Sequence, residues 1–211
     1  MPVIKIILLG DTSVGKTSFV SKYLKHDIPV THKSTIGAAM NSKKIDLYNT
    51  SVDLHIWDTA GQERYSSLTS LYYRSSNIAI IMYDITNPDS FIKAQDYYYD
   101  LISKGPENIV IGLVGNKSDI AIQDPLRRTI PFSVGKDWAD THNILFAETN
   151  VFNDNDAKCV FGTLIEQLPN DVIFSIKDED DSLLDNFMEN AERYNLYTYK
   201  SNKFNDCCII S

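Results

Sequence analysis

One segment, residues 10–17, constrains the fold of this chain more than any other feature. It reads GDTSVGKT and matches G-x-x-x-x-G-K-[ST], a loop whose backbone N–H groups cradle phosphate oxygens. The apolar run Ile4–Leu9 before it predicts a buried strand, and the apolar spacing over residues 16–25 predicts a helix. A phosphate loop between a strand and a helix is typical of α/β folds that hold a nucleoside triphosphate at the helix N-terminus.

The chain continues this alternation to about residue 171. Polar residues Asn49–Ser51 separate two segments and predict a β-hairpin of Lys43–Tyr48 with Val52–Trp57. Near-continuous apolar runs at Ile78–Tyr83 and Ile109–Val114 are typical of central parallel strands. The other predicted elements are a helix over 89–103 with Asn87 or Asp89 as N-cap, a strand at Ile144–Ala147, and a helix marked by Val160, Leu164, Ile165 and Leu168 that Pro169 ends. This order predicts a doubly wound sheet with one antiparallel hairpin, whose ligands bind beyond the C-terminal strand ends.

The composition restricts the classes of partner. With 211 residues, 43% of them hydrophobic, the chain suits one globular domain with a full-sized core. A net charge of −8 argues against DNA or RNA as a partner, because phosphate contacts need an excess of Lys and Arg. We find neither a bilayer-spanning apolar run nor a signal peptide, and we expect a cytosolic protein. Cys159, Cys207 and Cys208 show neither a disulfide framework nor a zinc spacing.

The phosphate loop supplies the first expected ligands. The Lys16 ammonium would contact the terminal phosphates, and the Thr17 hydroxyl would bind Mg²⁺. By itself this motif indicates only a nucleoside triphosphate. The predicted nucleotide contacts in this segment are Ser13, Val14, Gly15, Lys16, Thr17 and Ser18.

A second motif, DTAGQ at residues 58–62, follows the predicted strand that ends at Trp57. Asp58 would hold Mg²⁺ through water, and Gly61 would bring its N–H close to a γ-phosphate. Gln62 would orient the attacking water, the role of a Gln in GTPases, and is the predicted catalytic residue. Thr35 would complete the Mg²⁺ coordination only when a γ-phosphate is bound, which predicts a nucleotide-sensing switch.

A third motif, NKSD at residues 116–119, selects the base. Asp119 would accept hydrogen bonds from N1–H and the 2-amino group of guanine, a donor pair that adenine lacks. Asn116 and Lys117 belong to the same predicted contact set. The three motifs in this order predict a protein that binds GTP and GDP together with Mg²⁺.

With these motifs in place, residues 3–170 resemble a Rab-family small GTPase of the Ras superfamily. Further segments carry the resemblance: IWDTAGQERY at 56–65, YYR at 72–74 and YDIT at 83–86. The segment STIGAAM at 34–40 is most similar to the early-endosomal Rab subgroup. The resemblance implies a P-loop small-GTPase G domain over residues 1–171, with a mostly parallel six-stranded sheet, one antiparallel hairpin strand and about five helices.

The resemblance also implies a regulated cycle at membranes. The GTP form would bind effectors through switch regions near residues 28–41 and 59–75, where an exchange factor would reload GTP and a GTPase-activating protein would speed its slow hydrolysis. Prenylation machinery would add lipids to Cys207 and Cys208, and a dissociation inhibitor would bind the lipidated protein. The chain would act as a monomer in the cytosol and on the cytoplasmic face of intracellular membranes, with endocytic traffic at early endosomes as its function.

Residues 172–211 form a predicted flexible tail, with four Lys or Arg against eight Asp or Glu. This acidic segment offers no basic patch to assist lipid binding. Cys208-Ile-Ile-Ser also matches a C-a-a-X box by itself, and one or two lipids both fit the sequence. An alternative for part of the tail is a short helix with Leu183, Leu184, Phe187, Met188 and Ala191 on one face.

Three features depart from the Rab pattern. Ile28 stands where the family has an aromatic residue against the guanine ring, which predicts nucleotide release several-fold to about tenfold faster. The segment ETNVF at 148–152 replaces Glu-Thr-Ser-Ala-Lys. The backbone N–H of Val151, next to Asn150, would keep a contact to the guanine carbonyl, whereas the lysine along the base is lost. Thr12 is bulkier than the usual residue and would crowd the γ-phosphate or the attacking water.

Two alternatives stay open. A P-loop kinase for small metabolites would carry a lid with Arg residues, and we interpret Arg127-Arg128, the one Arg pair, as a solvated loop. A GTP-binding scaffold that hardly hydrolyses is favoured by Thr12 and Ile28 and opposed by Gln62.

Overall fold

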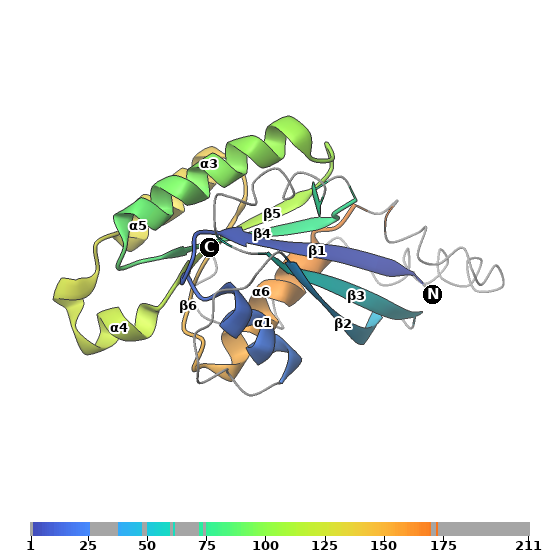
Figure 1. The fold of residues 1–211 in the computed structure, drawn as a ribbon, viewed down its shortest axis with the longest axis horizontal. Coiled ribbons are helices and arrows are strands. Elements are labelled where there is room, and N and C mark those ends of the chain that lie inside the picture. Colours follow the sequence, from blue (N-terminus) through green and yellow to red (C-terminus); the bar gives the residue numbers. More distant parts are fainter. Residues whose placement is uncertain are drawn as a thin grey trace, which may run out of the picture.

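The computed structural model describes residues 2–25, 38–47, 50–59, 61, 72–73, 75–169 and 172. Several predicted features lie outside these residues: Ile28, Thr35, Gln62, the cysteines Cys207 and Cys208, and the tail beyond residue 172. The described part is a three-layer α/β domain in which helices cover both faces of one sheet (Figure 1).

Six strands form the sheet in the order β2-β3-β1-β4-β5-β6. β2 pairs antiparallel with β3 and all other pairs are parallel, which confirms the predicted doubly wound sheet with one antiparallel hairpin strand. The strands are β1 Val3–Gly10, β2 Ala38–Leu47, β3 Thr50–Thr59, β4 Ile78–Asp84, β5 Val110–Asn116 and β6 Leu145–Thr149.

The hairpin differs from its prediction in one respect. Thr50 and Ser51, expected in the turn, belong to β3 and pair with Leu47 and Asp46. Side-chain polarity marked them as turn residues, but the ladder is formed by the backbone and continues past the last apolar side chain.

Five α-helices occur among the described residues: α1 Lys16–Leu24, α3 Pro88–Lys104, α4 Ser118–Gln123, α5 Phe132–Thr141 and α6 Asp154–Glu166. The predicted start of α3 is confirmed, since the Asn87 side chain accepts a hydrogen bond from the backbone N–H of Asp89 and Pro88 occupies the first turn. The sequence did not locate α4, which has six residues, or α5, whose buried positions are the small residues Gly135 and Ala139.

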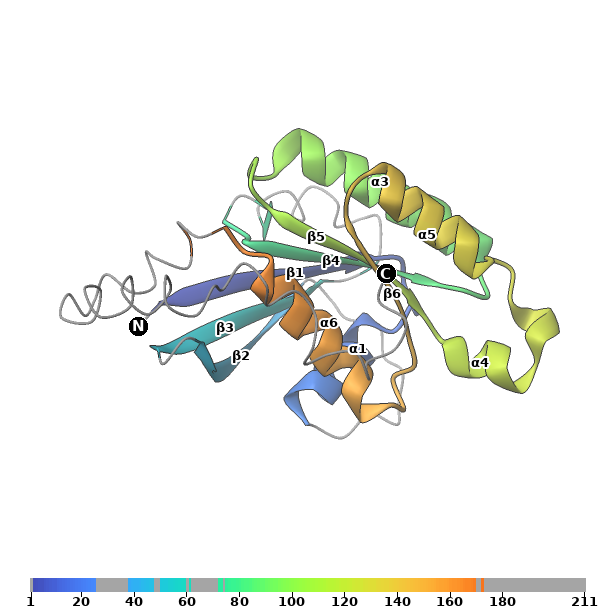
Figure 2. The same cartoon turned by 180° about the vertical axis from the view of Figure 1, so that it is seen from behind.

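Two hydrophobic cores lie on opposite faces of the sheet. Helices α1 and α6 cover one face and α3 and α5 cover the other, as both ribbon views show (Figures 1 and 2). Alternate β1 residues enter the two cores, with Ile6 and Leu8 on the α1 and α6 side and Ile7 and Leu9 on the other. This burial on both faces explains the uninterrupted apolar residues Ile6–Leu9 in β1.

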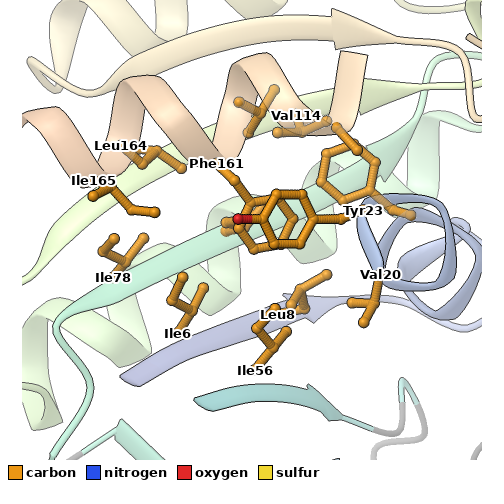
Figure 3. Packing of buried hydrophobic residues seen from close by; sticks show 14 of the residues in the cluster. Ile6, Leu8, Val20, Tyr23, Ile56, Ile78, Val114, Phe161, Leu164 and Ile165 are labelled. Carbon is orange, nitrogen blue, oxygen red and sulfur yellow. The ribbon is translucent and has the colours of Figure 1, made fainter. Parts of the chain in front are cut away.

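The core under α1 and α6 fixes α1 against the sheet (Figure 3). The Tyr23 ring of α1 stacks on the Phe161 ring of α6, with ring centroids 3.9 Å apart and an interplanar angle of 14°. Burial raises the pKa of the Tyr23 phenol to about 12. Since α1 follows the phosphate loop directly, this packing also holds that loop at the end of β1.

Because β1, β3, β4, β5 and β6 are all parallel, their C-terminal ends meet at one edge of the sheet. The three sequence motifs begin at the ends of β1, β3 and β5. The fold therefore brings the motifs to the edge where doubly wound sheets bind their ligands.

Candidate nucleotide-binding site

The loop after β1 adopts the backbone shape that its glycines permit. Gly10 and Gly15 have φ angles of +138° and +101°. A Cβ at Gly10 would lie 2.2 Å from the Met82 carbonyl oxygen, and one at Gly15 would lie 2.3 Å from the Asn116 amide nitrogen. The Ser13 backbone is also left-handed, with a φ angle of +62°, although Ser13 is not a glycine. Glycine is thus required at both motif positions by backbone angle and by space.

Helix α1 begins with its N-terminus open to a ligand. Its N-cap residue is Gly15, and no side chain caps the first turn, in which there is no acidic residue. The first N–H groups of an α-helix lack intrahelical acceptors and attract an anion. These groups belong to the residues predicted to contact phosphate, at 16–18.

The Lys16 ammonium is folded back over the loop. It donates to the backbone carbonyls of Gly10 and Asp11, each at 2.8 Å. Burial lowers the pKa of Lys16 to about 8, although Asp58 and Asp11 act in the opposite direction. A phosphate placed here would add a negative partner to a cation that the protein has already taken out of water.

Asp58 and Thr17 form the candidate Mg²⁺ site. The Thr17 hydroxyl donates to Asp58 Oδ2 at 2.6 Å, while Asp58 Oδ1 is buried and has no partner among the described residues. Burial raises the pKa of Asp58, with the Thr17 hydrogen bond and the Lys16 charge opposing it. A hydroxyl beside an unpaired carboxylate oxygen is the hard oxygen chemistry that Mg²⁺ prefers. The residues present therefore fit the cation.

Gly61 lies directly against the phosphate loop. A Cβ there would be 2.3 Å from the backbone nitrogen of Thr12 and 2.4 Å from the carbonyl carbon of Asp11. Next to it, the Thr59 hydroxyl donates to the Leu8 carbonyl at 2.6 Å and ties the end of β3 to β1. Gly61, the residue predicted to contact a γ-phosphate, therefore lies beside the phosphate loop. Gln62 lies outside the described residues.

Asn116 joins the phosphate loop to the end of the neighbouring strand β6. Its amide donates to the Val14 carbonyl at 2.8 Å, and its Oδ1 accepts from the Thr149 hydroxyl at 3.2 Å. The side chain is 1% exposed. Sequence reasoning placed Asn116 among the nucleotide contacts, and the structure shows it as the link that holds Val14 and Thr149 together.

Lys117 and Asp119 sit on either side of the start of α4. Lys117 has φ +70°, and its ammonium pairs with Asp84 Oδ2 at 2.7 Å. Burial alone would raise the pKa of Asp84, but hydrogen bonds from Lys117 and Thr86 outweigh it and lower this pKa. Asp119 lies half-buried in the first turn of α4, immediately after β5. The sequence did not predict the role of Asp84, which anchors Lys117 at the end of β4.

The loop after β6 carries the Val151 N–H that is predicted to meet the guanine carbonyl. The Asn150 N–H donates to Asp156 Oδ2 at 2.7 Å, and the Phe152 N–H donates to Asn150 Oδ1 at 2.8 Å. The N–H of Val151 lies between these two engaged groups, at the position predicted to meet the guanine carbonyl. Phe152, which replaces the lysine of the Rab pattern, is 68% exposed. Asp156, fully buried on α6, was not predicted as an anchor.

The interpretation of Arg127-Arg128 as a solvated loop is wrong for Arg128. Its guanidinium forms two bonds to Glu148, at 2.7 and 2.8 Å, and also donates to the Ile130 carbonyl at 3.1 Å. The Glu148 hydrogen bonds raise the pKa of Arg128 against the effect of burial. Only Arg127 is exposed. The pairing joins residues 20 positions apart, which the local sequence pattern does not reveal.

We predict that Arg128→Met lowers the free energy of unfolding by about 1–2 kcal/mol, because the bidentate pair is partly shielded from water. Nucleotide release should become several-fold faster, since Glu148 lies at the end of β6, just before the loop of Asn150 and Val151. Chemical denaturation and release of a fluorescent guanine nucleotide measure the two effects. Lys136→Met is the matched control: it removes a surface pair with Asp140 and should change stability by less than about 0.5 kcal/mol. Equal effects of both variants would contradict this role of Arg128.

The described residues contain no helix long and apolar enough to cross a membrane. They also contain no group of three or more His, Cys, Asp or Glu side chains arranged to hold a metal ion.

The phosphate loop, the Thr17–Asp58 pair and the Asn116 link together define a P-loop nucleotide-binding protein. The family model of the Ras family matches residues 5–170. Over 167 residues the chain is 41% identical to the Ras-related protein Rab-17 of Homo sapiens, an alignment that covers 79% of this chain and 76% of that protein. The chain belongs to the Rab family of the Ras superfamily.

This membership establishes the general activity. The protein is a GTP-binding switch of vesicle traffic that hydrolyses GTP to GDP. Members of the family bind GTP and GDP and generally Mg²⁺, and the fit of Thr17 and Asp58 to a hard cation agrees with this. The kinase alternative is wrong.

Proposed function

We propose that the edge of the sheet at the ends of β1, β3, β5 and β6 binds one guanine nucleotide with Mg²⁺. The observation that carries this proposal is the buried Asn116 side chain, which connects the phosphate loop at Val14 to the base-binding segments at Thr149. The hydrogen bonds of this one side chain therefore position the segments expected at both the phosphate end and the base end of the nucleotide. The phosphates lie on residues 13–18 and Gly61, and the base lies on Asn116, Lys117, Asp119, Asn150 and Val151.

The roles of the individual residues follow from their chemistry. Lys16 neutralises the terminal phosphates, and Thr17 and Asp58 would hold Mg²⁺. Mg²⁺, when bound, neutralises charge on the phosphate oxygens. Asp119 selects guanine through its donor pair, and the Val151 N–H meets the base carbonyl. Thr35 and Gln62 act as the switch residue and the water-orienting residue.

A surface on β2 and β3 supports effector binding at the switch regions. Met40, which is 50% exposed, pairs in register with Trp57, and the Trp57 ring lies 5.1 Å from the Tyr72 ring. The indole N–H of Trp57 has no acceptor among the described residues. An apolar patch of Met and aromatic side chains suits a protein partner, because these residue types are enriched at interfaces.

We further propose that the protein acts in endocytic traffic at early endosomes. The support is the segment at 34–40, together with Cys207 and Cys208 as sites for prenyl groups that would anchor the tail of residues 172–211. Two chains are proposed because one lipid gives only marginal binding and the tail is acidic. An exchange factor, a GTPase-activating protein, prenylation machinery and a dissociation inhibitor complete the proposed cycle of this monomeric protein.

Single-turnover hydrolysis of GTP separates the switch from a scaffold that hardly hydrolyses. Wild type should release phosphate at least about tenfold faster than Gln62→Leu, because leucine cannot orient water. Asn108→Ala, in an exposed turn, is the control and should match wild type. Equal, negligible rates in wild type and Gln62→Leu would support the scaffold.

Imaging tests the proposed location. The tagged protein should coincide with early-endosome markers, and Cys207→Ser with Cys208→Ser should release it to the cytosol. A wild-type protein that is diffuse, or that coincides with other membranes, would contradict the endosomal proposal and leave the nucleotide site unaffected.

A further inference from the structure

The phosphate loop itself contains an acidic residue, although a polyanion is expected to bind there. Asp11 follows Gly10 directly, and its side chain is 12% exposed. Its Oδ1 accepts from the backbone N–H of Thr12 at 2.7 Å. Negative charge beside a binding site for phosphates opposes the ligand, and burial reduces the screening of that opposition by water. The protein therefore needs a positive charge nearby.

Lys93 of α3 supplies this charge. Its ammonium lies 3.1 Å from each of the two carboxylate oxygens of Asp11. The two residues are 82 positions apart, and α3 belongs to the layer on the opposite face of the sheet from α1. The Lys93 side chain is 37% exposed, which limits the strength of the pair through solvent screening.

The Asp11 backbone is in contact with the residues expected to meet the terminal phosphate. Its carbonyl accepts from the Lys16 ammonium at 2.8 Å, and its carbonyl carbon would lie 2.4 Å from a Cβ at Gly61. GTP differs from GDP by one phosphoryl group at this end of the cradle. An uncompensated Asp11 carboxylate would therefore repel GTP more than GDP.

We propose that Lys93 is a positioning residue that sets the preference of the site for triphosphate over diphosphate by neutralising Asp11. It acts through Asp11 and does not touch the nucleotide. This inference rests on the proposed guanine-nucleotide site, since it concerns the γ-phosphate end of that site.

The test compares release of a fluorescent, non-hydrolysable GTP analogue with release of fluorescent GDP from full-length protein containing Mg²⁺. In Lys93→Met the release rate of the GTP analogue divided by that of GDP should rise about three- to tenfold, because the triphosphate loses more binding free energy than the diphosphate. Adding Asp11→Asn to Lys93→Met should restore the wild-type ratio within about twofold, because the repelling charge is gone. Raised salt should shrink the Lys93→Met effect by screening.

Lys104→Met is the matched control, because it removes another lysine of α3 that pairs with Asp100 on the surface. Its ratio should equal that of wild type, and so should the ratio of Lys93→Arg, which keeps the charge. The inference is overturned if Lys93→Met accelerates both releases equally, or if the double variant does not restore the ratio. If Lys93→Met does not fold, Lys93→Arg and the double variant must still both show the wild-type ratio, and a departure in either one overturns the inference. Wild-type protein that holds neither nucleotide would instead contradict the proposed function.

Discussion

Replacing Asp119 with asparagine is expected to lower the affinity for GTP by about a thousandfold. A carboxylate accepts two charge-assisted hydrogen bonds from N1–H and the 2-amino group of guanine, each worth about 1.5–3 kcal/mol. An amide keeps the size of the side chain but supplies one acceptor and one donor without charge. The donor then faces the guanine amino group, which is itself a donor, and two donors repel.

The same change should improve binding of a xanthine nucleotide, which carries a carbonyl where guanine has the amino group. Competition for a fluorescent guanine nucleotide, by GTP and by XTP, measures both effects. Asp124→Asn is the control, because Asp124 caps the short helix at Pro125–Arg127 and asparagine caps equally well. If Asp119→Asn kept wild-type affinity for GTP, Asp119 would not contact the base.

Asn116→Ala is expected to lower the free energy of unfolding by about 2–4 kcal/mol. The change removes the donor to the buried Val14 carbonyl and the acceptor of the Thr149 hydroxyl. Alanine cannot replace either bond, and the site has little access to water. Because Val14 lies in the phosphate loop, nucleotide release should also become about 10- to 100-fold faster.

Chemical denaturation and fluorescent-nucleotide release measure these two quantities. Asn108→Ala, in an exposed turn, should change stability by less than about 0.5 kcal/mol and leave release unchanged. A loss of stability without faster release would mean that Asn116 supports the fold but does not hold the phosphate loop in its binding shape.

The sequence predicted the elements whose signals are local. Buried parallel strands such as β1 and β4 show as nearly continuous apolar runs, and α3 shows its Asn87 cap and first-turn Pro88. The sequence motif predicted the phosphate loop, and the structure shows why its glycines are needed: Gly10 and Gly15 both have positive φ angles. Local propensity and global fold agree at these positions.

The anchors of the site were missed because they join distant parts of the chain. Arg128 reaches Glu148, and Lys117 reaches Asp84. Arg128 and Asp84, considered alone, carry no local sequence signal that would reveal these pairings. Only the sheet topology, which places the ends of β4, β5 and β6 side by side, brings the partners together.

The nucleotide that the purified protein carries shows whether the proposed site at the sheet edge binds guanine nucleotides. Protein purified with Mg²⁺ should release on denaturation about one guanine nucleotide per chain, as GDP or GTP, because tightly held ligands of this class survive purification. Extraction with a chelator should free that nucleotide, since Thr17 and Asp58 hold it through the cation. An adenine nucleotide in its place, or full-length folded protein that neither retains nor rebinds a guanine nucleotide, would contradict the proposed guanine-nucleotide site.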